Sequence, residues 1–360
     1  MRTVELGQVE LGRTGQRVTQ LALGCMLMGT FTDQASSYRI LDSYTGAGGN
    51  FLDTANCYAW WHRPESRAGE SEELLGRWFE RTGRRDDVFL ATKGSAMIRD
   101  LTGVWPTAGG DLPTGGGDRP SGGGGRPSGG GDPDWDLART RFEGAGADTL
   151  RRAVDDSLRR LRTDHIDLYY VHVDDLATPL EETLEALDGI VRSGKVRYVG
   201  WSNVRTWRLE RARQLADRYG WATPVALQQQ HTYLRRRAGL SQASIVDDEQ
   251  LDYLRANPDV SLVAYSPILK GVYDSAAKRD GHWAMEPYLG PDTDARITAV
   301  TSVAAELGVT PNQLVLAWLL HQTSPTLVPL IGPRTVEQYE AALPALDLKL
   351  TDDHLARLTT

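Results

Sequence analysis

The chain contains 360 residues, of which 40% are hydrophobic, 24% are charged and 8% are aromatic. This composition is typical of a folded globular protein and excludes a wholly disordered chain. The formal net charge of -8 also argues against nucleic acid as a partner, because binding to its backbone requires a surplus of Lys and Arg to neutralise the phosphates.

The N-terminal sequence MRTVELGQVELGRTGQRV lacks the apolar core of a signal peptide. No later stretch approaches the roughly 18 consecutive apolar residues that a membrane-spanning helix requires. We therefore expect a cytoplasmic protein that does not bind a membrane. The two cysteines, Cys25 and Cys57, are too few for a disulfide framework and have no CxxC spacing, so we expect them to be buried core residues and predict no metal site.

Apolar and β-branched runs alternate with longer amphipathic stretches along the chain, which is typical of parallel strands joined by helices. Eight runs are predicted to be strands, and they begin at Leu21, Phe51, Val88, Ile166, Val196, Val225, Ser261 and Leu327. Helix patterns lie between them, for example at 70–81, 148–161, 180–194 and 335–346. The whole chain, 1–360, is therefore predicted to be one α/β domain, a TIM (β/α)8 barrel with an N-terminal β-hairpin.

The structural alternative is a doubly wound open sheet that binds a dinucleotide. That fold carries a G-x-G-x-x-G turn after its first strand, and no such turn is present. The GAGGN sequence at 46–50 precedes a strand and is typical of a helix end.

Residues 100–135 are dominated by Gly, Pro, Ser and Asp and follow the third predicted strand. Such a segment cannot bury enough apolar surface to offset the entropy lost on ordering it. We expect a flexible Gly-rich insertion within the barrel domain. Because it leaves from the strand that carries Lys93, it either covers the reactive face as a lid or remains solvated, and both alternatives stay open.

Polar residues close several predicted strands, where the active site of a TIM barrel lies. Asp53, Lys93 and His172 end the second, third and fourth strands, and Tyr58 lies in the loop after the second. Together they predict a proton-donating site in which Tyr58 is the acid. In this interpretation Lys93 lowers the pKa of the phenol, Asp53 holds Lys93, and a neutral His172 polarises a carbonyl oxygen.

Each of these residues also has an ordinary structural explanation, such as a turn or a solvated strand end. A second chemical alternative is a metal site formed by His172 with Asp174 and Asp175. We disfavour it because no second histidine lies at ligand spacing, and carboxylates alone suit weakly held, oxygen-ligated cations.

None of these groups can supply a hydride, so a nicotinamide cofactor is predicted. TIM barrels frequently bind phosphate near the last two strands, at the N-terminus of a helix. In the sequence VPLIGPRTVEQYEAAL, Gly332 permits a close backbone approach and Thr335 is positioned to cap the helix. Arg334 and Gln338 lie on one side of its first turn, where Arg334 can hold a phosphate.

Three further side chains suit the nicotinamide end of such a cofactor. Ser202 and Asn203 close the fifth predicted strand and Gln228 closes the sixth, and their hydroxyl and amide groups can bind a carboxamide. Tyr265 ends the seventh strand and offers a flat ring for stacking.

Seven sequence segments resemble, in the same order, motifs of the aldo-keto reductase superfamily, particularly its potassium-channel-beta-subunit-like branch of bacterial reductases. They are FLDTANCY, GESEELLG, LATKG, SLRRLRTDHIDLYYVH, GWSNV, AYSPILKG and IGPRTVEQ. The resemblance spans nearly the whole chain except the Gly-rich insertion. It implies a TIM barrel that binds NADPH, with NADH also possible, and reduces an aldehyde or ketone to an alcohol.

The resemblance also implies a role for each matching residue. Tyr58 is the acid of a tetrad completed by Asp53, Lys93 and His172. The residues implied to bind the cofactor are Ser202, Asn203 and Gln228 at the nicotinamide amide, Tyr265 on its ring, Ser266, Pro267, Ile268, Leu269 and Gly271 along the pyrophosphate, and Arg334 and Gln338 toward the 2'-phosphate. Ile331 and Gly332 are implied to bind the cofactor as well. Ala341 and Ala342 stand where the family usually places an acidic residue and an asparagine against adenine, which leaves the choice of NADP or NAD open.

Two other functions compete with the reductase. The GWSNV sequence resembles a degenerate nucleophile elbow with Ser202 as the nucleophile of a hydrolase, but Val204 occupies the position of the required second glycine. The other alternative is a nucleotide-binding accessory subunit that senses redox state and has little turnover. For a reductase, the aromatic side chains predicted near the mouth favour a flat or sugar-like carbonyl substrate, and they are Trp60, Trp61, Tyr273 and Trp283.

Overall fold

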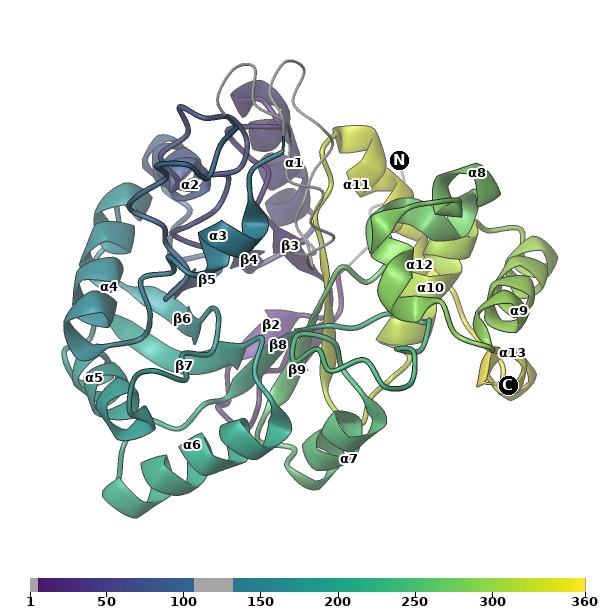
Figure 1. Cartoon of the computed structure of the whole chain (residues 1–360). Helices are drawn as coiled ribbons and strands as arrows, with labels where there is room; N and C mark the ends of the chain where they lie inside the picture. The colour runs from purple at the N-terminus through teal and green to yellow at the C-terminus, as the bar shows by residue number, and fades with distance from the viewer. Residues whose placement is uncertain (1–5, 107–131, 360) are drawn as a thin grey trace.

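The computed structural model describes residues 6–106 and 132–359. Eight parallel strands close into a barrel in the order β10-β3-β4-β5-β6-β7-β8-β9, with helices around them (Figure 1). The strands are β3 (Ala22–Gly24), β4 (Phe51–Asp53), β5 (Phe89–Gly94), β6 (Ile166–Val171), β7 (Val196–Ser202), β8 (Ala226–Gln230), β9 (Ser261–Tyr265) and β10 (Leu327–Ile331). Each predicted strand is confirmed. The doubly wound sheet is excluded because β10 pairs with both β9 and β3, so the sheet has no open edge.

Helices connect the strands on the outside of the barrel. The longer ones are α1 (Gln34–Gly46), α2 (Glu70–Thr82), α4 (Ala147–Leu161), α5 (Leu180–Arg192), α6 (Thr206–Tyr219), α7 (Asp248–Ala256), α9 (Thr293–Leu307), α10 (Pro311–Leu320) and α13 (Asp352–Thr359). The shorter ones are α3 (Trp135–Arg139), α8 (Ala276–Arg279), α11 (Val336–Ala342), α12 (Pro344–Asp347) and the 3-10 segments η1 (Leu269–Asp274) and η2 (Trp283–Tyr288). The single helix predicted at 335–346 is therefore wrong. It divides into α11 and α12 because Pro344 has no backbone N–H to donate.

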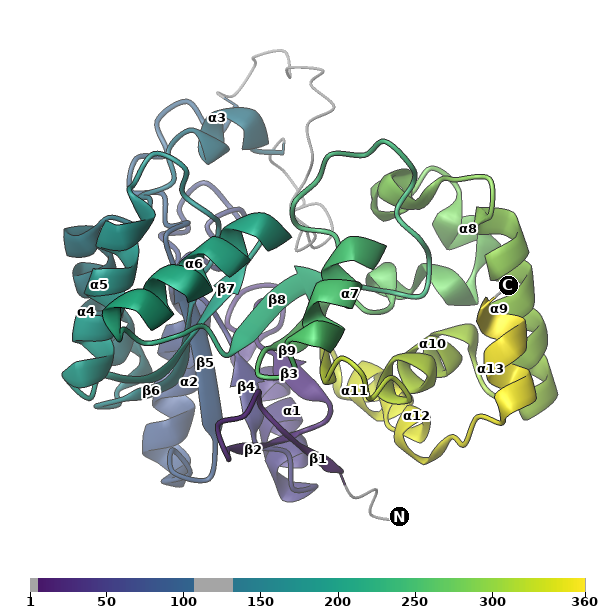
Figure 2. The ribbon, with the colours of Figure 1, turned by 90° about the horizontal axis from the view of Figure 1, so that it is seen from below.

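The N-terminal hairpin, β1 (Gln8–Glu10) and β2 (Arg17–Thr19), pairs in antiparallel fashion as expected. Leu11 and Val18 are fully buried and pack with Phe51 and Phe89 inside the barrel. The hairpin lies at the opposite end of the barrel from α3 (Figure 2). One end of the barrel is thus filled with apolar side chains, and the end where the strands finish is left for a site.

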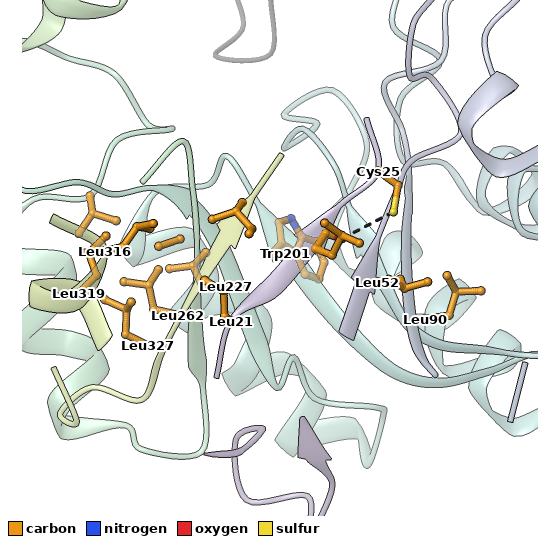
Figure 3. Close-up of a cluster of buried hydrophobic side chains, with 14 of the residues drawn as sticks. Leu21, Cys25, Leu52, Leu90, Trp201, Leu227, Leu262, Leu316, Leu319 and Leu327 are labelled. Atoms are coloured by element: carbon orange, nitrogen blue, oxygen red, sulfur yellow. Dashed lines mark hydrogen bonds between the residues drawn. The ribbon is translucent and has the colours of Figure 1, made fainter. Parts of the chain in front are cut away.

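A second apolar layer lies between the strands and the helices. Figure 3 shows part of this layer, in which leucines of several strands meet Leu316 and Leu319 of α10. Burial of one such side chain contributes about 1.5–3 kcal/mol. Because the barrel strands are covered on both faces, every residue of β4, β5 and β6 is buried, which explains why the strands are continuous apolar runs in the sequence.

The Gly-rich insertion was expected to be flexible from 100 to 135, and its central part lies outside the described residues. At both ends of the segment the described residues make ordered contacts. Val104 and Trp105 are buried, and the Asp134 side chain accepts hydrogen bonds from two backbone N–H groups at the start of α3. Trp135 is the first residue of that helix, so the ends are anchored by apolar burial and a helix cap. The lid hypothesis concerns residues outside the described ranges.

No single helix in residues 6–106 and 132–359 is long and apolar enough to cross a membrane. In the same part of the chain, one pair of helices, α9 with α10, meets the length and composition required when taken together, and the two are bent by 96° relative to each other.

Candidate active site

Three of the four residues predicted at the site are joined directly by hydrogen bonds. Asp53 ends β4, and Lys93 lies on the adjacent strand β5. Lys93 Nζ donates to Asp53 Oδ1 at 2.5 Å, to the Thr54 carbonyl at 2.7 Å and to Tyr58 Oη at 2.9 Å. An ammonium has three N–H groups, so all of them are used. Because Lys93 donates to the phenol oxygen, the hydroxyl hydrogen of Tyr58 is free to be donated to another group.

The carboxylate of Asp53 is held from a second side by Gln228. Gln228 Nε2 donates to Asp53 Oδ2 at 2.8 Å, so each carboxylate oxygen accepts a hydrogen bond. Burial raises the pKa of Asp53, and the charge of Lys93 opposes that rise. Gln228 was predicted to close its strand but is the third residue of β8. The strand continues through Gln229 and Gln230, which are buried and whose side-chain amides donate hydrogen bonds. Their polarity alone suggests a strand end, so the sequence did not predict this continuation.

The phenol of Tyr58 departs from expectation in one respect. Lys93 was expected to lower its pKa, but that pKa is raised well above 10, mainly by burial and then by the negative charge of Asp53. The pKa rises because the desolvation of a phenolate outweighs the attraction of one ammonium that is already neutralised by a carboxylate. Tyr58 therefore keeps its proton at neutral pH, and it is an acid rather than a base in this state.

His172 follows β6 directly and completes the cluster. Its ring meets the ring of Tyr58 edge to face, with centroids 5.7 Å apart. Burial, together with the charge of Lys93, holds the pKa of His172 well below 6.5, so the imidazole is neutral. Its Nδ1 lies 3.4 Å from Cys57 Sγ, a contact that the sequence did not predict.

The alternative metal site does not assemble around His172. Asp174 binds Arg208 at 2.7 Å, and Asp175 accepts a hydrogen bond from the backbone N–H of Ala145. Among the described residues, no group of three or more His, Cys, Asp or Glu side chains is arranged to hold a metal ion.

A cavity of about 1440 Å³ opens over Asp53, Tyr58 and His172. Such a volume exceeds that of most small-ligand pockets, which reach about 1,000 Å³, and suits an extended cofactor with a small substrate. Most residues predicted to bind the cofactor line it, namely Ser202, Asn203, Gln228, Tyr265, Ser266, Pro267, Ile268, Gly271, Ile331, Gly332, Arg334 and Gln338. Leu269 is the exception, because its side chain is buried in the apolar core instead.

The segment after β9 has an unusual backbone along this cavity. Ser266, Leu269 and Lys270 have φ angles of 52°, 44° and 62°, in the left-handed region that disfavours residues with a Cβ. Strain of this kind is concentrated at functional sites, where the surrounding structure holds it. It curls the chain so that Lys270 lines the cavity, where burial and then the charge of Arg334 lower its pKa to about 8. Lys278 also lines the cavity, and its ammonium lies beside Gly271. These three basic side chains suit a phosphorylated ligand.

Arg334 is held by the first turn of α11. Its backbone N–H donates to Gln338 Oε1 at 2.8 Å, and Thr335 caps the helix by accepting from the Gln338 N–H. The guanidinium lies 5.7 Å from the centre of the Phe31 ring. Gln338 therefore supports Arg334, and the predicted cap at Thr335 is confirmed.

Several aromatic side chains line the cavity. Trp60, Trp61 and Trp283 line it as expected, but Tyr273 does not, because its side chain is buried with the hydroxyl bonded to Thr232. Trp135 of α3 was not predicted to lie here. Its ring lies 4.7 Å from that of Trp60, centre to centre, and Trp135 also lines the cavity.

The start of α10 also lies at the cavity, which the sequence did not predict. Thr310, Asn312 and Gln313 line the cavity beside Ala341 and Ala342. The Thr-Pro-Asn-Gln sequence of a capping box marks this helix N-terminus and could have identified it.

The surroundings of Ser202 do not support the hydrolase alternative. Ser202 Oγ accepts a hydrogen bond from Asn203 Nδ2 at 3.1 Å. In the part of the chain that the structure describes, no histidine lies within hydrogen-bonding distance of this hydroxyl, whereas a serine nucleophile requires one or an equivalent base.

Comparison with known proteins agrees with this geometry. Residues 20–360 match the Aldo/keto reductase family, so the chain belongs to that family. It is 33% identical to the uncharacterized oxidoreductase YrpG of Bacillus subtilis, over 97% of this chain and 93% of YrpG. It is 26% identical to the aryl-alcohol dehydrogenase [NADP(+)] of Phanerodontia chrysosporium, over 95% of this chain and 82% of that protein. The crystal structure of the thermostable aldo-keto reductase Tm1743 with the inhibitor epalrestat superposes with a TM-score of 0.67 at 25% identity and 98% coverage of both chains.

Membership of this family makes the protein an oxidoreductase. The family match does not distinguish its branches, so the likeness to the potassium-channel-beta-subunit-like branch rests on the sequence motifs alone.

Proposed function

We propose that this protein uses NADPH to reduce an aldehyde or ketone to an alcohol, with Tyr58 as the general acid. One observation carries the proposal. The ammonium of Lys93 contacts both Asp53 and the phenol oxygen of Tyr58, within a cavity that His172 also lines. A positive charge against a protonated phenol is the arrangement required to deliver a proton and stabilise the phenolate left behind.

The reduction needs a hydride at the carbonyl carbon, which a bound nicotinamide supplies. Tyr58 donates its proton to the carbonyl oxygen as negative charge develops there. Lys93 already donates to the phenol oxygen, so it stabilises the phenolate without rearrangement, and Asp53 keeps the ammonium in place. The neutral imidazole of His172 donates an N–H to the same carbonyl oxygen. In the reverse direction the phenolate of Tyr58 takes the proton from an alcohol.

The lining of the cavity fits a nicotinamide dinucleotide. At one end, Tyr265 Oη donates to Asn203 Oδ1 at 2.8 Å, and Asn203 Nδ2 donates to the His172 carbonyl at 2.8 Å. This chain of bonds places an aromatic ring and an amide beside the tetrad, as the nicotinamide end requires. At the other end, Lys270 and Arg334 suit the phosphates.

NADPH is the favoured cofactor because Arg334 supplies a cation for a 2'-phosphate, and because a relative is named as NADP(+)-dependent. Ala341 and Ala342 offer only methyl groups to this end of the cavity, so the adenine receives no side-chain hydrogen bond from them. We therefore expect NADH to be used as well, with a higher KM.

The substrate is proposed to be a flat carbonyl compound, and an aromatic aldehyde is the first to test. Trp60, Trp61 and Trp135 form a wall beside Tyr58, with the ring centres of Trp61 and Tyr58 6.2 Å apart. Aromatic rings pack against such a wall in offset or edge-to-face arrangements. The name of the aryl-alcohol dehydrogenase relative supports this choice. A sugar-like compound is the second class to test.

A nucleotide-binding accessory subunit with little turnover, suggested by the motif resemblance to the potassium-channel-beta-subunit-like branch, is the alternative. The hydrogen bonds of Lys93 to Asp53 and Tyr58, and the ring contact of Tyr58 with His172, favour a working enzyme over it. Titration of protein fluorescence with NADPH and NADH, followed by a panel of carbonyl compounds, separates the two. We expect binding and turnover. Tight nucleotide binding without reduction of any carbonyl contradicts the proposed function.

A further inference from the structure

The thiol of Cys57 lies against the ring of His172 at the wall of the cavity. Cys57 Sγ is 3.4 Å from His172 Nδ1, and both residues line the cavity. Within residues 6–106 and 132–359, no other side chain lies within hydrogen-bonding distance of that imidazole. The backbone of His172 is held separately, by the carbonyl of Gly94 and by Asn203 Nδ2, each at 2.8 Å. The ring is therefore oriented by its packing on Tyr58 and by Cys57, and among the described residues Cys57 is the one side chain within hydrogen-bonding distance of a ring nitrogen.

The ionisation states of the two groups decide the direction of this hydrogen bond. Burial raises the pKa of the Cys57 thiol to about 12, so the sulfur keeps its hydrogen at neutral pH. The pKa of His172 is held well below 6.5 by burial and by the charge of Lys93, so the imidazole is neutral. A neutral imidazole has one N–H donor and one acceptor nitrogen. Among the described residues the buried S–H has no acceptor other than Nδ1.

We propose that Cys57 is a positioning residue whose S–H donates to His172 Nδ1 and so keeps the imidazole hydrogen on Nε2. Nε2 is then the nitrogen available to donate to a carbonyl oxygen in the cavity. Donation from Nε2–H to a substrate carbonyl rests on the proposed function. The tautomer of His172, however, is a property of the protein without substrate. Cys57 itself transfers nothing to the substrate, and its effect passes through His172.

The tautomer is measured directly by two-dimensional NMR of the full-length protein labelled with 15N-histidine. The chain has 7 histidines, and a His172→Gln variant identifies the resonances of His172. We expect the wild type to have a hydrogen on Nε2 and an unprotonated Nδ1. In Cys57→Ala the donor is lost, so a population with hydrogen on Nδ1 is expected to appear. Cys57→Ser retains an O–H donor and is expected to return the spectrum toward that of the wild type.

Cys25→Ala is the matched control. Cys25 is also a buried cysteine, but its thiol donates to the Leu23 carbonyl at 3.6 Å and makes no contact with His172. Its removal tests the general effect of a missing buried thiol. We expect the His172 resonances of this variant to match those of the wild type.

Kinetics give the second readout. Relative to Cys25→Ala, kcat of Cys57→Ala is expected to fall about three- to tenfold, the range for loss of one weak hydrogen bond, while the Kd for NADPH stays unchanged. Cys57→Ser is expected to recover most of the rate. The proposal is overturned if His172 carries its hydrogen on Nδ1 in the wild type, or if its resonances do not change in Cys57→Ala. If the tautomer shifts as expected but even the wild type reduces no carbonyl, the positioning role stands and the proposed reductase function fails.

Discussion

Lys93 Nζ lies 2.9 Å from Tyr58 Oη and donates a hydrogen bond to it, while a second N–H of the same ammonium binds Asp53. The lysine side chain is fully buried, so water cannot replace this contact. Burial, and then the charge of Asp53, raises the pKa of the phenol, so Tyr58 is protonated in the resting protein and is adjacent to the charge that would stabilise its anion.

Lys93→Met removes that charge and keeps the length of the side chain. We expect kcat to fall by at least a hundredfold, because the phenolate loses its stabilising partner. The variant also leaves Asp53 as an unpaired buried carboxylate, which costs about 3–5 kcal/mol of unfolding free energy. Denaturant unfolding monitored by fluorescence measures that loss.

The double variant Lys93→Met with Asp53→Asn separates the two effects. It contains no unpaired charge, so we expect most of the stability to return while the activity remains low. Recovery of activity in the double variant would show that Lys93 serves only to neutralise Asp53.

The dependence of the rate on pH follows from the raised pKa of Tyr58. Reduction needs the protonated phenol, so its kcat is expected to stay level from pH 6 until the pH exceeds about 10, the ordinary pKa of tyrosine. Oxidation of the alcohol needs the phenolate, so its kcat is expected to rise with pH over the same range. Rate profiles for both directions test this expectation, and a reduction rate that falls between pH 7 and 9 contradicts it.

Arg334→Ala tests the phosphate end of the cavity. We expect the KM for NADPH to rise about tenfold, equivalent to about 1.4 kcal/mol, while the KM for NADH changes little. Arg151→Ala is a suitable control, because Arg151 lies on the exposed face of α4 and pairs with Asp148. Equal effects on both nucleotides would remove the role in binding the 2'-phosphate.

Trp135→Ala tests the aromatic wall. The variant loses the ring that packs on Trp60, so the KM for aromatic aldehydes is expected to rise severalfold while small aliphatic aldehydes are affected less. Trp221→Ala is the control, since Trp221 stacks on Tyr219 and does not line the cavity. A uniform loss with every aldehyde would indicate that Trp135 serves only to hold α3.

The barrel could be predicted because burial on both faces makes its strands continuous apolar runs, and polar residues such as Asp53 and His172 end them. The contacts within the site were harder to predict from the sequence. The rise in the pKa of Tyr58 depends on the depth of burial, and Gln228 reaches Asp53 only because β8 continues past it. Trp135 follows a Gly-rich segment that gives no indication of where the chain returns.

Single-turnover reduction by Tyr58→Phe tests the central claim most directly. The variant keeps the ring and removes the transferable proton. With NADPH bound and an aromatic aldehyde added, the absorbance of the reduced nicotinamide is expected to decay at least about a hundredfold more slowly than in the wild type, with the Kd for NADPH unchanged. Tyr219→Phe, on the exposed surface of α6, is expected to react at the wild-type rate. Decay at the wild-type rate in Tyr58→Phe would contradict the assignment of Tyr58 as the proton donor.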